Sequence, residues 1–408
     1  MPASSSTAPS PWPVIAAAAA ILLVTMGARQ TIGLFIAPLD GATGLGIVSI
    51  SLAVAVGQFV WGLAQPLFGA VADRYGPGRV IATGGLMLAA GTAATPFVRS
   101  ETGLILVLGV VSAFGAGAGS LSILIGSVMQ RVTSGRRSTA AGIINAGGSL
   151  GQFVFAPAVQ MAILGIGWVG AMWGVAAATL LTLPLAIAMR RRGSPRMAAA
   201  AMPASPGLTL GRQLREAATE RSYWLLHLGF FTCGFHVAFL VTHLPGEVRL
   251  CGLSPIVSAN SLAIIGLANV AGSLGAGWLG TRFRLKHLLF WIYSGRAAAI
   301  LAYMMAPKTA LTFYVFATGL GVTWLATLPP TAGLVGKLFG MRYIATLIGL
   351  TMLSHQLGAF YGAWLGGMAV AHFGDYTWMW IADAGLAIFA ALINLPIREA
   401  PVLREAAA

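Results

Sequence analysis

Charged side chains are scarce in this sequence. Asp, Glu, Lys and Arg make up 8% of its 408 residues, and the acidic residues number only 10. A soluble domain typically carries about 25% charged residues, so the composition excludes an ordinary soluble protein. Since 57% of the residues are hydrophobic, the sequence predicts an integral membrane protein.

Cysteine is nearly absent as well. The two cysteines, Cys233 and Cys251, flank one end of an expected helix and form no disulfide framework, although a single bridge between them is the alternative. The sequence shows no metal-spaced cluster of His, Cys and acids and no phosphate-cradling glycine loop followed by Lys. We therefore expect no enzyme activity, no metal and no cofactor.

Long apolar runs dominate the rest of the chain. Twelve of them are close to or above the ~20 residues needed to cross the hydrocarbon core of a bilayer. They are 14–38, 48–72, 80–98, 102–129, 138–162, 166–189, 222–246, 255–280, 287–305, 309–335, 343–371 and 376–396. Because the first run continues through Arg29, we interpret it as a retained span and not as a cleavable signal.

The basic residues are distributed unevenly between the two sides of these runs. Alternate connections and the C-terminal tail hold 19 of the 24 Lys and Arg residues, whereas the opposite connections hold only Arg99, Arg249 and Lys308. Such a bias marks the cytoplasmic side of a membrane protein. Both termini are therefore expected in the cytoplasm, with the protein in the cell (inner) membrane. The net charge of +14 reflects this topology and does not indicate a nucleic-acid partner.

The spans divide into two sets of six. A basic and Pro-rich linker, 190–221, which ends in a possible amphipathic helix, separates them. The expected organisation is a tail at 1–13, a bundle at 14–189, the linker, a bundle at 222–396 and a tail at 397–408. Residues also recur at an offset of 207, so that Gly27 matches Gly234 and Gly151 matches Gly358. Such internal repeats are typical of transporters.

The connection after the second span carries a motif, 69-GAVADRYGPGR-79. An acid at a helix end can pair with a nearby Arg and form a latch, here from Asp73, Arg74 and Arg79. The pattern resembles the signature loop of the major facilitator superfamily. Its counterpart in the second half keeps Arg282 but has Thr281 in the place of the acid. The resemblance implies a cytoplasmic gate; a basic loop that only fixes topology is the alternative.

Two further stretches resemble one branch of that superfamily. The stretches 136-RRSTAAGIINAGGSLGQFVFAP-157 and 349-GLTMLSHQLGAFYGAWLGG-367 are similar to the monocarboxylate transporter and oxalate–formate antiporter branch. The resemblance implies an all-α fold of twelve transmembrane helices in two pseudo-symmetric six-helix bundles, which work as a monomer around a central cavity. The sequence departs from the animal members, because Asn269 and Ser273 occupy the places of their Asp and Arg in the eighth span.

Three residues inside the expected spans carry a formal charge. Arg29 lies in the middle of the first span, where a guanidinium is costly. The resemblance implies that this span lines the cavity, so Arg29 is expected to bind an anion; a structural arginine bonded to helix carbonyls is the alternative. Arg296, ten residues into its span, is expected to be a structural tie with Asp383 as its partner.

The candidate substrate site gathers polar residues of both halves. At the repeat offset, Arg29 corresponds to His236. The expected substrate-binding residues are Arg29, Asn145, His236, His355, Gln356 and Tyr361, although a helix histidine can also be a packed core residue. No Asp or Glu lies in the spans expected to face the cavity, so His355 is the candidate for proton coupling because histidine titrates near neutral pH.

The sequence thus predicts a secondary transporter that moves a small organic anion, a monocarboxylate in the first instance, across the bilayer by alternating access, with protons as a candidate co-substrate. The alternative is an exporter of a neutral or amphipathic compound in which Arg29 is structural. A receptor or sensor on the same fold is a third reading, and no attached signalling domain supports it.

Overall fold

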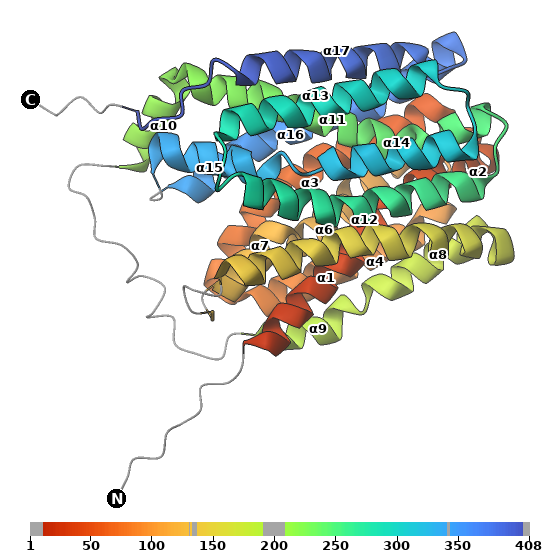
Figure 1. Cartoon of the computed structure of the whole chain (residues 1–408). Helices are drawn as coiled ribbons and strands as arrows, with labels where there is room; N and C mark the ends of the chain where they lie inside the picture. Colours follow the sequence, from red (N-terminus) through yellow and green to blue (C-terminus); the bar gives the residue numbers. More distant parts are fainter. Residues whose placement is uncertain (1–10, 130, 133–136, 191–208, 341–342, 403–408) are drawn as a thin grey trace, which may run out of the picture.

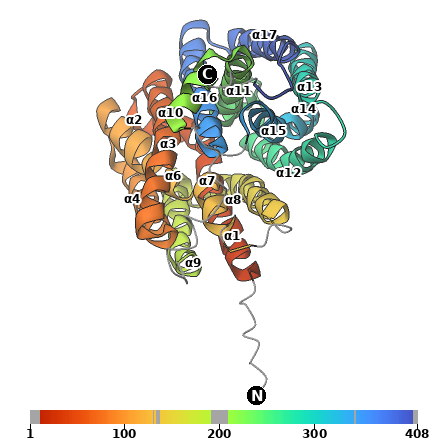
Figure 2. The same cartoon turned by 90° about the vertical axis from the view of Figure 1, so that its left-hand side faces the viewer.

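The computed structural model of the protein describes residues 11–129, 131–132, 137–190, 209–340 and 343–402. Regular structure in this part of the chain is helical throughout. The first half and the second half of the chain form two bundles of long helices that lie side by side (Figures 1 and 2). By length and composition, ten helical stretches among the described residues can cross a membrane.

The first bundle is broken by kinks at several places. Its helices are α1 (Trp12–Gln30), α2 (Gly33–Thr43), α3 (Ile47–Tyr75), α4 (Pro77–Ala94), α5 (Glu101–Leu104), α6 (Ala113–Ala118), α7 (Leu121–Met129), α8 (Arg137–Thr179) and α9 (Thr182–Ala188), with η1 at Thr95–Phe97 and a π-helical η2 at Ile105–Ser112. The expected first span is therefore two helices separated at Thr31. Gly167, with a φ of 78°, interrupts α8 close to the expected division between the fifth and sixth spans, because only glycine adopts this conformation readily.

The second bundle follows the linker. Its helices are α10 (Leu210–Thr219), α11 (Arg221–Leu250), α12 (Pro255–Leu279), α13 (Leu285–Met305), α14 (Ala310–Thr323), α15 (Leu328–Phe339), α16 (Ile344–Phe373) and α17 (Thr377–Asn394). α10 is the short helix expected at the end of the linker, while residues 191–208 lie outside the described residues. The expected tenth span is divided into α14 and α15 by a non-helical segment that begins at Trp324.

The twelve expected spans all fall on helical stretches, but the number of crossings stays a prediction. The stretch Thr139–Ala188 counts as one of the ten, and α16 is not among them, since it carries His355, Gln356 and many glycines. The seventh span was expected to end at residue 246, whereas α11 continues to Leu250. Glu247 is thus a buried carboxylate of this helix, whose oxygen accepts a hydrogen bond of 2.6 Å from Tyr303.

Small residues allow the helices of each bundle to approach closely, as is usual in membranes. A Cβ on Gly151 of α8 would lie 2.1 Å from the carbonyl oxygen of Leu23 in α1. A Cβ on the matching Gly358 of α16 would lie 1.9 Å from the carbonyl oxygen of Phe231 in α11. The two halves therefore pack their first and fifth spans in the same way, as the repeat indicates.

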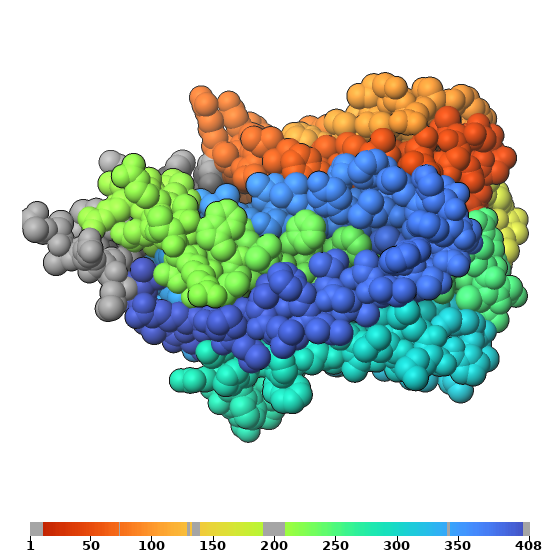
Figure 3. Space-filling view, turned by 90° about the horizontal axis from the view of Figure 1, so that it is seen from above, coloured from red at the N-terminus to blue at the C-terminus, as the bar shows by residue number. Residues whose placement is uncertain are grey.

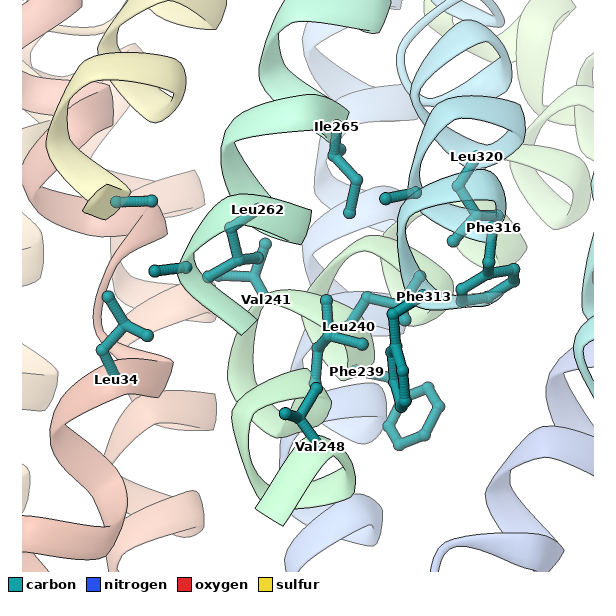
Figure 4. Packing of buried hydrophobic residues seen from close by; sticks show 14 of the residues in the cluster. Leu34, Phe239, Leu240, Val241, Val248, Leu262, Ile265, Phe313, Phe316 and Leu320 are labelled. Atoms are coloured by element: carbon teal, nitrogen blue, oxygen red, sulfur yellow. The ribbon is translucent and has the colours of Figure 1, made fainter. Parts of the chain in front are cut away.

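The two bundles also share apolar contacts. The largest core cluster runs from Leu34 of α2 to the aromatic residues of the second bundle, including Phe239, Phe313 and Phe316, and Figure 4 shows Leu34 directed toward α11 and α12. From above, α16 and α17 (blue) and the first helices of the second bundle (green) form the middle of the visible face, with the first bundle along one long edge (Figure 3). α1 begins and α17 ends at one end of the molecule, here called the terminal end, and α2 lies at the opposite, far end (Figure 1).

Candidate functional site

A large cavity lies between the two bundles. Its volume is about 1060 Å³, and most of its wall is apolar. Polar side chains on the wall come from six helices of both halves: Arg29 and Gln30 of α1, Gln58 and Gln65 of α3, Ser122 and Ser127 of α7, Asn145 and Ser149 of α8, Asn269 of α12, and Thr346, His355 and Gln356 of α16. A second cation, Arg131, lines the wall in the turn after α7 and donates hydrogen bonds to the carbonyl oxygens of residues 188–190. No Asp or Glu lines it among the described residues.

The cavity extends toward the terminal end. There its wall includes Pro77 at the start of α4, Gly126 of α7 and Ala345 at the start of α16. At the far end the bundles touch. A Cβ on Gly33 of α2 would lie 2.2 Å from the carbonyl oxygen of Val241 in α11, and one on Gly367 of α16 would lie 2.4 Å from the hydroxyl of Ser51 in α3. The molecule is therefore closed at the far end.

Arg29 lies in the last turn of α1, just before the chain bends into α2. A cation is stabilised there because the carbonyl end of a helix carries partial negative charge. Its Nη2 donates a hydrogen bond of 2.6 Å to Oε1 of Gln58. Its guanidinium carbon lies 4.0 Å from the ring centroid of Trp61, a cation–π distance. No carboxylate of a described residue pairs with it.

Three other polar groups on the wall keep free hydrogen-bonding capacity. The buried Oε1 atoms of Gln30 and Gln356 have no partner among the described residues. Asn145 faces the cavity without a hydrogen bond to a described residue. Buried polar atoms are usually partnered, so these groups offer donors and acceptors to a bound molecule.

His355 is one of the expected residues that the cavity does include. It is 8% exposed, and its ring packs 5.0 Å from that of Phe230. Its Nδ1 lies 3.4 Å from Nε2 of the adjacent Gln356. Gln356 itself packs against Gly62 of α3, where a Cβ would lie 2.4 Å from Cγ of the glutamine. α16 thus brings both residues to the boundary between the bundles.

Two expected substrate-binding residues lie elsewhere. His236 is completely buried inside the second bundle, where its Nδ1 pairs with Oδ2 of Asp383. Tyr361 is 43% exposed and packs against the rings of Phe231 and Phe360. Neither residue lines the cavity, so the structure corrects both placements.

Asp383, the expected partner of Arg296, was also wrong. Nη2 of Arg296 donates to the backbone oxygens of Thr323 at 2.5 Å and Trp324 at 2.9 Å. These carbonyls end α14 and lack helical partners. Broken helices are tolerated at membrane depth only where the freed groups are satisfied or line a cavity. Arg296 thus joins α13 to the break between α14 and α15, and its role as a structural charge stays a prediction.

The expected gate residues lie at the terminal end. Arg74 lies in the last turn of α3, with its guanidinium carbon 5.3 Å from the ring centroid of Tyr75, while Arg79 is an exposed residue of α4. Gly76 between these helices has a φ of 91°, which explains the glycine of the motif. Arg282 follows α12 and stacks 4.1 Å from the ring of Trp278. The side chain of Asp73 lies outside the described part of the chain.

The contact of Arg29 with Trp61 was not predicted. Trp61 lies one turn beyond Gln58 on α3, and this spacing on one helix face was the signal that could have found it. Asn269, which stands in the place of an acid of the animal transporters, donates a hydrogen bond of 2.9 Å to Ser149 of α8 and so joins the bundles. Among the described residues, no three His, Cys, Asp or Glu side chains gather as metal ligands.

Comparisons with known proteins agree with this architecture. Monocarboxylate transporter 13 of Bos taurus is 25% identical over 390 residues, with 94% of this chain and 89% of that protein covered. The oxalate:formate antiporter of Oxalobacter formigenes is 23% identical over 374 residues, with 90% and 86% covered. A solved bacterial homologue of the human lysosomal transporter Spinster, inward-facing and unoccupied, has a TM-score of 0.73 at 15% identity and 96% coverage of both chains. The model of the Major Facilitator Superfamily matches residues 18–363, and the chain belongs to that family.

Proposed function

We propose that this protein is a secondary transporter of a small organic anion, in the first instance a monocarboxylate. The observation that carries this proposal is Arg29. Its guanidinium lies on the cavity wall, and no carboxylate of a described residue neutralises it. An unpaired cation in a mostly apolar cavity favours an anionic ligand, because the ligand supplies the missing charge in a medium of low dielectric constant.

The geometry around Arg29 suits a carboxylate. A guanidinium carries five N–H donors, and Gln58 takes up one of its nitrogens. The remaining donors can hold the two carboxylate oxygens in a bidentate, charge-assisted pair. Asn145, His355 and Gln356 complete the polar part of the site, while apolar wall residues such as Met26 and Val237 receive the rest of the substrate. His236 and Tyr361 have no place in this site.

Transport follows from exchange between two arrangements of the bundles, 14–189 and 222–396. The open terminal end is the cytoplasmic one on the evidence of the basic connections, so the cavity faces inward here. The loops with Asp73, Arg74 and Arg282 would close it on the way to the outward-facing state. The names of the similar proteins, a monocarboxylate transporter and an oxalate:formate antiporter, support the anion class. The working unit is a monomer in the cell (inner) membrane.

One experiment tests the anion proposal. Proteoliposomes that contain the purified protein are loaded with unlabelled monocarboxylates. Counterflow of a panel of labelled monocarboxylates is then measured for the wild type, Arg29→Ala and the control Arg99→Ala. Arg99 is exposed in a connection far from the cavity. We expect counterflow in the wild type and the control and its loss in Arg29→Ala. Normal counterflow in Arg29→Ala, or no competition by carboxylates, contradicts the proposal.

The second candidate function is export of a neutral or amphipathic compound. It is favoured by the mostly apolar wall of the cavity and by the contacts of Arg29 with Gln58 and Trp61, which give the guanidinium a structural role. In the same vesicles, this function predicts transport of amphipathic compounds that carboxylates do not inhibit.

A further inference from the structure

A pair of ionisable side chains lies inside the second bundle, behind the cavity wall. Nδ1 of His236 in α11 hydrogen bonds with Oδ2 of Asp383 in α17. Both residues are 0% exposed. Neither Nε2 of His236 nor Oδ1 of Asp383 has a partner among the described residues. Such a pair is expensive to bury, so its presence calls for a reason other than stability.

A third charge lies next to this pair. Arg296 of α13 is fully buried and within electrostatic range of His236. Two of its donors, Nε and Nη1, are unpartnered among the described residues. When His236 is neutral, Arg296 and Asp383 balance to zero net charge. When His236 takes up a proton, the cluster carries one positive charge.

The cluster is connected to the cavity through Cys233, which lies one turn before His236 on α11. Its sulfur lies 3.7 Å from the carbonyl oxygen of Trp324, the same oxygen that Arg296 contacts. The sulfur also lies 3.4 Å from the hydroxyl oxygen of Thr327 and within electrostatic range of the side chain of His355, which lines the cavity. Trp324 lines the cavity too, and its ring centroid lies 5.9 Å from that of His236. A single layer of side chains therefore separates the pair from the substrate site.

The other titratable groups near the pair are already hydrogen bonded to other partners. The hydroxyl of Tyr293 in α13 donates a hydrogen bond of 2.6 Å to the carbonyl oxygen of Gly229. His243, two turns farther along α11, lies 2.7 Å from the carbonyl oxygen of Ala363 and 3.3 Å from the hydroxyl of Tyr376. Asp383 and Arg296 are the charged groups that act on His236 among the described residues, while Cys233 and His355 lie between the pair and the cavity.

We propose that the His236–Asp383 pair is the proton-binding site that couples anion transport to the proton gradient, an inference that rests on the proposed transport of an anion. The carboxylate of Asp383 accepts a hydrogen bond from Nδ1–H of the neutral His236 ring. The lone pair of Nε2 is then free to take the proton. No bond other than N–H forms or breaks. The proton belongs to the pair as a unit.

The coupling is electrostatic. A proton on the pair adds one positive charge behind the wall, and a carboxylate at Arg29 adds one negative charge in front of it. In a medium of low dielectric constant each charge stabilises the other, so the two ions bind and leave together. His355 and Cys233 lie on the route between cavity and pair. This arrangement supplies the proton carrier that the cavity wall, without a carboxylate among its described residues, lacks.

The test separates exchange from uphill transport in proteoliposomes. Counterflow at equal pH needs no net proton movement. Accumulation of the anion inside the vesicles, driven by a more acidic outside medium, does need it. A gradient of about one pH unit can drive roughly tenfold accumulation when one proton accompanies each anion. We expect the wild type to show both activities. Asp383→Asn leaves the cluster with the permanent positive charge of Arg296, so this variant should retain counterflow within about twofold but accumulate no anion above the outside concentration. His236→Gln holds the cluster at zero net charge, so it should also accumulate no anion and should need a several-fold higher anion concentration for half-maximal counterflow.

Asp375→Asn is the matched control. This acid lies at the start of the same helix, where it caps the N–H of Thr377 in an exposed position, and its loss should leave both activities unchanged. Accumulation at the wild-type level in either folded pair variant overturns the proposal. A wild type that exchanges anions but ignores the pH gradient also overturns it. A wild type without counterflow instead contradicts the proposed function.

A folding defect in one variant is covered by the other. A second measurement needs no variant: anion addition to wild-type vesicles in weakly buffered medium should raise the external pH as protons enter with the anion. An unchanged external pH during measurable anion uptake overturns the proposal.

Discussion

Gln58 of α3 accepts a hydrogen bond of 2.6 Å from the guanidinium of Arg29 in α1. The amide satisfies one donor without neutralising the charge, so the cation keeps its capacity to pair with an anionic ligand. A carboxylate in the same place would form an internal salt bridge and compete with the substrate.

The first prediction concerns this neutral partner. Gln58→Glu should abolish anion counterflow or raise the half-saturating concentration by at least about tenfold, because displacing the internal carboxylate costs a charged hydrogen bond of roughly 1.5–3 kcal/mol. Gln58→Met should only weaken transport. The measurement is counterflow of a labelled monocarboxylate against its concentration.

Gln65→Glu is the matched control for this prediction. Gln65 lines the cavity two turns nearer the terminal end and accepts a hydrogen bond from Ser122. Seven residues of helix displace the new charge by about 10 Å, where the internal pair with Arg29 cannot form. Equal losses in both variants would mean that the negative charge acts on the cavity as a whole and not through Arg29.

The second prediction concerns the closed far end. Gly33→Ala places a methyl group 2.2 Å from the carbonyl oxygen of Val241, so α2 and α11 must separate. We expect this variant to shift the protein toward the outward-facing state. In a Ser51→Cys background, a membrane-impermeant maleimide should label the new cysteine several-fold faster, because Ser51 of α3 is buried against Gly367 of α16 in the neighbouring contact between the bundles.

Gly41→Ala is the control for the far-end contact. It adds the same methyl group to α2 at a position with no atom within 4 Å of the new Cβ. Its labelling rate should equal that of the parent. If Gly33→Ala labels no faster than Gly41→Ala, the contact between Gly33 and Val241 does not hold the far end closed.

The sequence predicted the fold better than the site. Long apolar runs, the basic connections and the repeat are properties of whole segments, and they located helices that the structure contains. Arg29 was expected on the cavity wall because the family resemblance implies that the first span lines it, and because a guanidinium in mid-span needs a polar surrounding. The kinks that build the cavity, at Thr31 and at Trp324, had no comparable signal.

His236 and Tyr361 were misplaced because a span gives depth but not rotation about the helix axis. The repeat matched His236 with Arg29 in depth, yet its side chain faces α17 and meets an acid 147 residues later in the chain. Tyr361 lies five residues after Gln356, which is about 140° around an α-helix. Because Gln356 faces the cavity, the side chain of Tyr361 is turned away from it.

The third prediction concerns Arg296. Arg296→Met should lower the stability of the protein by about 3 kcal/mol, because it leaves two buried carbonyls and the charge of Asp383 uncompensated. Thermal unfolding in detergent, followed by tryptophan fluorescence, checks this. The control Arg282→Met removes an exposed cation from the ring of Trp278, worth only about 0.5–1 kcal/mol. Similar losses in both variants would contradict the assigned role of Arg296.

The fourth prediction concerns the C-terminal segment after α17. Oε1 of Glu399 accepts hydrogen bonds from the backbone N–H of Leu285 at 3.0 Å and from Nζ of Lys337 at 2.7 Å. Burial raises the pKa of Glu399, but the hydrogen bond from Lys337, followed by that from Leu285, outweighs burial and holds the pKa below its ordinary value of 4.5. The segment thereby fastens the start of α13 to the end of α15.

A carboxyl group whose pKa is lowered on folding stabilises the folded state above its unfolded pKa, and this contribution is lost as the pH falls through the folded pKa. Glu399→Gln should therefore lower the apparent Tm at pH 7 by about 2–4 °C for each kcal/mol lost, and the difference from the wild type should shrink below pH 4.5. The control Glu216→Gln removes an exposed i,i+4 pair with Arg212, which contributes little. A Tm difference for Glu399→Gln that stays constant from neutral to acidic pH would show that the charge of Glu399 does not fasten these helices.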